Sequence, residues 1–122
     1  MLTNENLTVL TNCSSAEEAH RIAEYLVQNR LAACVNVGSS PIESIYRWNG
    51  KLETASEIPL LIKTSRARYA AVEHAIRKLH SYEVPEIIAI PITAGSANYL
   101  SWLAESVAEA APPLVAKNKK SG

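Results

Sequence analysis

Apolar residues recur along the chain with two periods, and each period predicts one kind of secondary structure. Short runs of apolar and β-branched residues, closed by turn-forming residues, are typical of strands. Apolar residues spaced by three and four are typical of helices that bury one side. The runs predict strands over residues 7–11, 31–38, 42–48, 51–64 and 86–92, and the spacing predicts helices over residues 16–29, 66–80 and 100–107.

The start of the first predicted helix carries a capping signal. Ser14 precedes Glu17 by three residues, and Ser15 precedes Glu18 by the same interval. At this spacing a serine hydroxyl accepts a hydrogen bond from a free amide of the first turn, while the glutamate bonds back. Either serine can therefore begin the helix.

The strongest local signal is the dipeptide Asn49-Gly50 between two apolar runs. Both residues tolerate the positive φ that a type I′ turn requires, so the flanking runs are predicted to form a hairpin. Pro41 and Pro59 have no N–H donor. Each proline therefore predicts a bulge or an edge position in its strand.

The predicted order βαββαβ, followed by a short helix, indicates a ferredoxin-like α+β sandwich with a long central hairpin and an extra C-terminal helix. We predict one domain over residues 1–109 and a disordered tail over the polar and basic residues 110–122. The hairpin over residues 42–64 is longer than so small a sandwich covers, and its edges expose unpaired backbone groups. Pairing with another copy of the chain would cover them. The apolar run at 86–92 predicts a strand covered on both faces or placed at a subunit contact.

Composition narrows the possible partners and location. The chain has 122 residues, of which 48% are hydrophobic, enough for one core. Twelve basic and twelve acidic residues cancel, so no overall field attracts nucleic acid or an anionic membrane, and neither is an expected partner. With no basic signal region at the start and no apolar stretch near the roughly 20 residues that span a bilayer, we predict a cytoplasmic protein. Cys13 and Cys34 are accordingly predicted to be free thiols.

Three stretches of sequence resemble one known family. Residues 31–36 read LAACVN, residues 45–51 read IYRWNGK, and residues 80–89 read HSYEVPEIIA. Together they resemble the CutA family, the divalent-cation tolerance proteins. The resemblance implies a ferredoxin-like subunit in a tight homotrimer with strands paired across subunits, and a link to tolerance or binding of copper and other divalent cations. At Ser14 the family commonly carries a proline, which leaves the geometry of that loop open.

The candidate metal ligands are His80, Glu83 and Cys34. His80 and Glu83 share the loop before the last strand, where a second subunit could add ligands, and the thiolate of Cys34 suits Cu(I). Each also has a structural interpretation. His80 can cap the second helix, Glu83 can face water, and Cys34 can be a small buried hydrophobe. Cys13 lies at a strand-to-helix turn, where a helix N-terminus would lower its pKa and make it the more reactive thiol.

A ligand cleft between subunits is a second candidate site. Aromatic rings with one cation can hold a small anionic or planar ligand in an apolar pocket. The alternative is that the rings pack in the core or at an interface, because large rings are scarce in this chain. The candidate cleft residues are Tyr46, Trp48, Lys63, Tyr82 and Trp102.

The motifs favour a binding protein over an enzyme. The sequence contains no phosphate-binding glycine loop, no nucleophile elbow and no HExxH motif. Our first hypothesis is a homotrimeric protein of divalent-cation tolerance that binds copper or another divalent cation weakly. The alternative is a trimeric regulatory module that binds a small metabolite at subunit clefts and signals to a partner protein. A third hypothesis, an enzyme, would need a titratable pair with perturbed pKa values inside a pocket.

Overall fold

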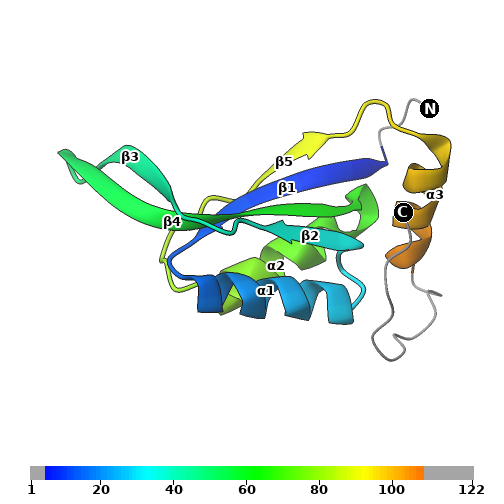
Figure 1. Cartoon of the computed structure of the whole chain (residues 1–122), viewed down its shortest axis with the longest axis horizontal. Coiled ribbons are helices and arrows are strands. Elements are labelled where there is room, and N and C mark those ends of the chain that lie inside the picture. The colour runs from blue at the N-terminus through cyan, green and yellow to red at the C-terminus, as the bar shows by residue number, and fades with distance from the viewer. Residues whose placement is uncertain (1–4, 109–122) are drawn as a thin grey trace.

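The computed structural model describes residues 5–108, which form an antiparallel sheet with two helices on one face and a third helix at one end (Figure 1). The sheet order is β2-β4-β1-β5, and β3 pairs with the N-terminal half of β4. This topology confirms the predicted ferredoxin-like α+β sandwich. The predicted tail at 110–122 and the domain end at 109 lie outside the described residues. The elements are β1 (Asn6–Cys13), α1 (Ala16–Gln28), β2 (Cys34–Val37), β3 (Ile42–Trp48), β4 (Lys51–Ser65), the short 3₁₀ helix η1 (Arg66–Arg68), α2 (Tyr69–Leu79), β5 (Ile88–Pro91) and α3 (Ala97–Ser106).

The second predicted strand is shorter than expected, because its first residues finish the preceding helix. The N–H groups of Leu31 and Ala32 both donate to the carbonyl of Leu26, at 2.9 and 3.1 Å. Carbonyls in the last turn of a helix lack partners inside the helix and must find them beyond it. These two amides are therefore directed at α1, and β2 begins only at Cys34.

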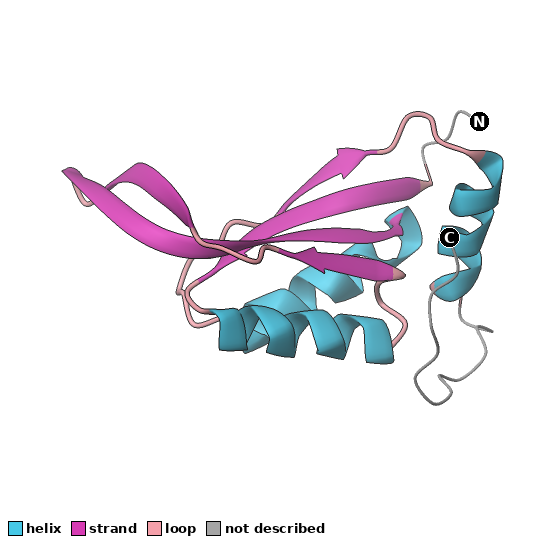
Figure 2. Ribbon diagram, in the orientation of Figure 1, coloured by secondary structure: helices cyan, strands magenta, loops and turns pink. Residues whose placement is uncertain are grey.

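The hairpin turn is the one that the sequence predicts. Asn49 has φ 50° and Gly50 has φ 76°, so both central residues lie in the left-handed region that a type I′ turn requires. Trp48 and Lys51 face each other across the turn, and β3 pairs with β4 in unbroken register from there to Ile42. The hairpin projects beyond the ends of α1 and α2 (Figure 2).

Replacing Gly50 by valine is expected to lower the free energy of unfolding by about 1–2 kcal/mol, the cost of a left-handed backbone for a residue with a branched Cβ. A Cβ at Gly50 would meet nothing within 4 Å, so backbone strain alone causes the loss. Denaturant unfolding at fixed protein concentration measures it. Gly50→Asn is the control, because asparagine tolerates this region. Equal stability of the valine and asparagine variants would contradict the assignment of strain.

β4 is the central strand, and its neighbours along one edge change at Pro59. β3 pairs with β4 over residues 51–57, and β2 pairs with it over residues 60–63. Pro59 lies in the break between them, where a residue without an N–H costs no ladder bond on that side. Its carbonyl accepts from the N–H of Gly38 at 3.0 Å. On its other side Pro59 faces Asn12 of β1, so of the two predicted positions, a bulge or a sheet edge, the edge is wrong.

The core lies between the helices and one face of the sheet. Because side chains alternate along a strand, every second residue of β1 and β4 points to this face. The largest fully buried apolar side chains are Val9, Ile22, Leu26, Leu60, Ile62, Val72, Ile76 and Leu103. Those from β1, β4, α1 and α2 belong to one core cluster, whereas Leu103 of α3 is buried outside that cluster.

The opposite face of the sheet carries exposed apolar side chains in the described part of the chain. Leu61, Ile88 and Ile90 are 39%, 50% and 52% exposed, and the register places Leu61 and Ile88 on either side of Leu10. None of the helices in residues 5–108 covers this face (Figure 1). The expectation that the strand near residues 86–92 is covered on both faces is therefore wrong for one chain, and its alternative, a subunit contact, stays a prediction.

Candidate functional site

Glu18 fastens the loop between α2 and β5 to the start of α1. Its Oε1 accepts a hydrogen bond from the N–H of Ser14 at 2.8 Å and one from the Ser14 hydroxyl at 3.1 Å. Its Oε2 accepts from the N–H of Ser81 at 2.7 Å. The side chain is only 3% exposed. One buried carboxylate therefore joins two segments that lie 63 residues apart in the chain.

The predicted capping box is formed in part. Ser15 is the N-cap of α1, and its hydroxyl accepts from the N–H of Glu18 at 3.1 Å. The return bond of Glu18 goes to Ser14 and not to Ser15. Ser14 therefore uses both its N–H and its hydroxyl to hold this carboxylate.

Two opposing effects act on the pKa of Glu18. Burial disfavours the charged carboxylate and raises the pKa. Hydrogen bonds from Ser14 and Ser81, together with the nearby His80 ring, stabilise the charged form and lower it. The second effect prevails, so the pKa of Glu18 lies below its ordinary value and the carboxylate is ionised at neutral pH.

His80 caps the end of α2 and is tied to the end of β1. Its Nε2 lies 2.7 Å from the carbonyl oxygen of Asn12, and its Nδ1 lies 3.0 Å from the backbone nitrogen of Tyr82. A carbonyl only accepts and an amide N–H only donates, so Nε2 donates and the Nδ1 lone pair accepts. Both ring nitrogens are thus engaged. The His80 and Tyr82 rings also pack together, with centroids 4.7 Å apart.

Cys13, Glu18 and His80 form a compact group of metal-ligand types. One ligand atom from each lies within 4.8 Å of the others, and all three residues are buried. Burial first, and then the Glu18 and Glu57 charges, raise the pKa of the Cys13 thiol to about 12. The expectation that the helix N-terminus makes Cys13 a reactive thiol is therefore wrong, because desolvation outweighs it.

A cleft of about 890 Å³ lies beside this group, between the hairpin and the loop before β5. The strand pleat places Ser44, Tyr46 and Trp48 on one face of β3. The opposite wall comes from the loop over residues 81–86. The lining residues are Asn12, Ser44, Ile45, Tyr46, Trp48, Ala55, Glu57, Ser81, Tyr82, Glu83, Val84, Pro85 and Glu86.

A buried carboxylate lies where the two walls of the cleft meet. Glu57 is 8% exposed, and its Oε1 accepts from the hydroxyl of Ser44 at 2.6 Å. Burial first, and then the Glu57 carboxylate, raise the pKa of the Tyr82 hydroxyl. Glu86 accepts from the side-chain amide of Asn12 at 3.1 Å. The cleft therefore has fixed polar groups on both walls.

The structure brings together only some of the predicted site residues. Tyr46, Trp48 and Tyr82 line the cleft, and Glu83 lies in the same lining. Lys63 and Trp102 do not. Trp102 is on α3, at the end of the molecule away from the hairpin, and its ring packs on Tyr99 with centroids 5.4 Å apart (Figure 1).

Cys34 and Lys63 lie together at the other end of the sheet. They face each other across β2 and β4, and the ammonium group of Lys63 donates to the side-chain oxygen of Asn36. Cys13 faces Ile58, five positions from Lys63, or roughly 17 Å along β4. Within one chain, Cys34 is therefore too far from His80 to share an ion with it.

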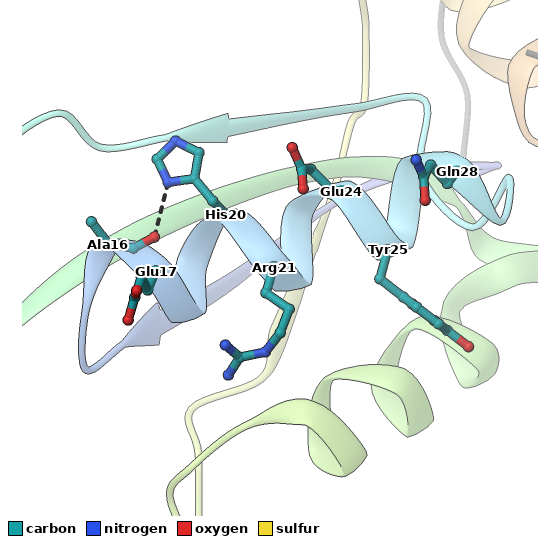
Figure 3. Close-up of a pocket in the computed structure, with 7 residues that line it drawn as sticks. All are labelled: Ala16, Glu17, His20, Arg21, Glu24, Tyr25 and Gln28. Carbon is teal, nitrogen blue, oxygen red and sulfur yellow. Dashed lines mark hydrogen bonds between the residues drawn. The ribbon is translucent and has the colours of Figure 1, made fainter.

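A shallow groove of about 630 Å³ along α1 has no second wall (Figure 3). Its lining residues, from Ala16 to Gln28, all belong to this one helix. His20 uses Nδ1 to donate to the carbonyl of Ala16 at 2.8 Å. The side chains of Arg21 and Tyr25 point toward α2 in Figure 3, away from His20. The groove is an exposed helix face and gathers no set of ligands.

Comparison with known proteins identifies the family. Residues 7–106 match the family described as CutA1 divalent ion tolerance protein. The chain belongs to this family. A divalent-cation tolerance protein CutA from Archaeoglobus fulgidus is 44% identical over 93 residues, covering 76% of this chain and 89% of that protein. Its counterpart from Thermus thermophilus is 44% identical over 98 residues, covering 80% and 94%.

Solved CutA structures share the fold. The divalent cation tolerance protein Cut A1 from Thermus thermophilus superimposes with a TM-score of 0.82 at 42% identity, covering 84% of this chain and 99% of that one. The family resemblance found in the three sequence stretches is therefore confirmed. In residues 5–108 of this CutA-family chain, no helix is long and apolar enough to cross a membrane.

The sequence did not predict three buried residues of the CutA-family chain as ligands or cleft residues: Cys13, Glu18 and Glu57. Cys13 was weighed only for its reactivity, Glu18 only as part of a capping signal, and Glu57 not at all. Glu18 and Glu57 are acidic residues buried to more than nine-tenths, a state that charged residues reach only with partners. A signal existed for Glu18 alone, in its spacing from the capping serines.

Proposed function

We propose that this protein is a homotrimer that contributes to divalent-cation tolerance by binding metal ions weakly, with copper as the test ion. Membership of the CutA1 family supports the link to divalent cations. The group formed by Cys13, Glu18 and His80 is the main structural support for metal binding. A thiolate, an imidazole and a carboxylate together suit copper better than magnesium or calcium, which prefer oxygen ligands alone.

The same geometry supports weak binding. At neutral pH the Cys13 thiol is protonated, because its pKa is about 12, and a metal must displace that proton. The ring nitrogens of His80 are held by Asn12 and Tyr82, so one of these hydrogen bonds must break before the ring can coordinate. Both steps cost free energy and lower the net affinity.

Assembly is supported by surface that one chain leaves uncovered. Leu61, Ile88 and Ile90 form a bare apolar face, and contiguous exposed apolar surface marks contact sites. Residues 51–57 of β4 pair with β3 on one edge, while β1 reaches only Ile58 on the other. Such an unpaired edge is a template for a strand of another chain. The number of three copies comes from the resemblance to the CutA family.

Titration of metal-stripped protein with Cu(II) tests the metal proposal. We expect saturable binding at one site per chain, tighter at pH 8 than at pH 6, because the ligands release protons on binding. Cys13→Ser and His80→Gln should each weaken binding by about ten-fold or more, the scale at which altered ligation changes metal affinity. Isothermal calorimetry with a light-scattering mass measures affinity and assembly together.

Cys34→Ser and Glu83→Gln are matched controls for these variants. They remove the two other predicted ligands, neither of which belongs to the Cys13 group, so the affinity for Cu(II) should stay unchanged. Loss of binding in Cys34→Ser alone would move the site to the far end of β2 and overturn our assignment. A trimer that does not bind copper at all would overturn the metal proposal.

The cleft supports a second candidate function, a regulatory module that holds a small metabolite and signals to a partner protein. Its volume of about 890 Å³ lies within the usual range for ligand sites. Tyr46, Trp48 and Tyr82 supply aromatic wall, and Glu57 supplies a buried polar group. Trp48 is nevertheless 46% exposed, so a ligand or a neighbouring chain would bury additional apolar surface there.

We also propose a binding protein and not an enzyme, located in the cytoplasm. Catalysis by Cys13 would require an activated thiolate, and its raised pKa opposes this. Both cysteines are free thiols, as the sequence predicts, which fits a reducing compartment. Activity assays and fractionation of cells test these two points.

A further inference from the structure

We infer that the cleft between the hairpin and the loop over residues 81–86 selects small organic cations that carry an ammonium group. This inference rests on the second candidate function, because it assigns a chemical class to the ligand of the same cleft. The sequence instead predicts that Lys63 helps to hold a small anionic or planar ligand in the cleft. Lys63 lies outside the cleft, beside Cys34 and Asn36.

The charge of the lining favours a cation. Among residues 5–108, the charged residues of the lining are Glu57, Glu83 and Glu86, and no lysine, arginine or histidine of this range belongs to it. Within the described residues, none of the three carboxylates forms an ion pair with a basic side chain. A concave site with like charges on its walls focuses the field and attracts ions of the opposite sign.

The aromatic walls favour an organic cation. Tyr46 and Trp48 come from β3, and Tyr82 comes from the facing loop, so rings line both sides of the cleft. The face of an aromatic ring attracts an ammonium group electrostatically, and aromatic cages recognise quaternary ammonium in this way. Tyr82 is held by packing on His80, with ring centroids 4.7 Å apart. The cage is therefore partly rigid before any ligand arrives.

The spacing of the carboxylates argues against a bare metal ion in the cleft. In residues 5–108, the one group of three His, Cys, Asp or Glu ligand atoms within 4.8 Å of one another is that of Cys13, Glu18 and His80. The three cleft carboxylates do not meet this condition. A divalent metal needs several ligands at about 2.0–2.6 Å, whereas an ammonium group can be attracted by carboxylates spread over a wider wall.

Three probes of similar shape and different charge test the inference on the assembled full-length protein. Tetramethylammonium, tert-butanol and pivalate each present methyl groups around one centre, with positive, neutral and negative charge. The indole N–H signal of Trp48 reports occupancy by NMR, in a Trp102→Phe background that removes the other tryptophan signal. We expect tetramethylammonium to bind about 2- to 30-fold more tightly than tert-butanol, the range of cation–π attraction, and pivalate to bind most weakly.

Variants locate the source of the selectivity. Trp48→Leu keeps an apolar wall but removes the indole ring. Tetramethylammonium should then bind no more tightly than tert-butanol, as measured by line broadening of the probe signals. Glu83→Gln should weaken tetramethylammonium binding by up to about five-fold, as expected for one exposed charge, and leave tert-butanol unchanged. Glu24→Gln is the matched control, because it removes the same charge from the outer face of α1 and should change neither probe.

The outcomes separate this inference from the function on which it rests. Equal binding of tetramethylammonium and tert-butanol, or tighter binding of pivalate, would overturn the cation selectivity and keep the cleft as a ligand site. Failure of all three probes to shift the Trp48 signal would overturn both, and would assign the cleft to side chains of a neighbouring copy.

Discussion

Glu18→Ala is expected to lower the free energy of unfolding by about 2–4 kcal/mol, because the amides of Ser14 and Ser81 lose a charged acceptor. The loop over residues 81–86 should loosen with it, since Ser81 is the contact that holds its start. Thermal and denaturant unfolding of metal-stripped protein, at one fixed concentration, measure the loss. Faster amide hydrogen exchange in the loop would locate it.

The neighbouring residue Glu17 provides the control. It occupies the same first turn of α1 but is exposed, so Glu17→Ala should change stability by less than about 0.5 kcal/mol. If the two alanine variants were equally stable, Glu18 would not fasten the loop, and the hydrogen bonds to Ser14 and Ser81 would contribute nothing measurable.

The same carboxylate makes stability depend on pH in acid. The folded-state pKa of Glu18 lies below its ordinary value of 4.5, so its contribution is fully present above pH 4.5. That contribution is lost as the pH falls through the depressed folded pKa, because the unfolded chain takes up the proton first. Glu18→Gln should therefore show a shallower loss of stability in acid than the unaltered protein. Parallel curves would contradict this link.

A charge placed on the bare sheet face is expected to abolish assembly. Ile90→Asp would bury an unpaired carboxylate in any contact made through this face, at a cost of several kcal/mol per chain. Sedimentation should then show a species near the chain mass of 13.3 kDa in place of the larger assembly. Since assembly stabilises the folded chain, the melting temperature should also fall and become independent of concentration.

Tyr25→Asp is the control for this substitution. Tyr25 is 43% exposed on α1, on the helical side of the molecule, so it introduces the same charge at a similar exposure away from the sheet face. Its assembly should be unchanged. An assembled Ile90→Asp variant would show that the contact lies elsewhere, for instance along the free edge of β4.

The sequence predicted most of the fold because the local signals were mutually consistent. The register of the hairpin follows from Asn49-Gly50, and the start of α1 follows from Ser15. The prediction of β2 was less accurate because Leu31 and Ala32 are apolar enough for a strand but are needed to finish a helix. The hydrophobic pattern alone does not show whether a backbone amide pairs in a strand or bonds to the last turn of a helix.

The candidate site was harder to predict, because it joins residues that only the fold brings together. His80 was chosen for its chemistry, but its partners Cys13 and Glu18 come from the other end of the chain. Lys63 was chosen for its charge, and the strand pleat turns it to the open sheet face beside Cys34. Ile62 precedes Lys63 directly on β4 but points into the core, because successive side chains of a strand point to opposite faces of the sheet.

The continuity of β4 has a consequence for the order in which the sheet forms. The hairpin half closes across a two-residue turn, whereas the β1 half must join Cys13 to Ile58 and Asn6 to Ser65, separations of 45 and 59 residues. Local contacts of low contact order form sooner, because closing a short loop costs less chain entropy. The hairpin is thus expected to be the earliest ordered part of the sheet, and β4 then provides the template on which the terminal strands assemble.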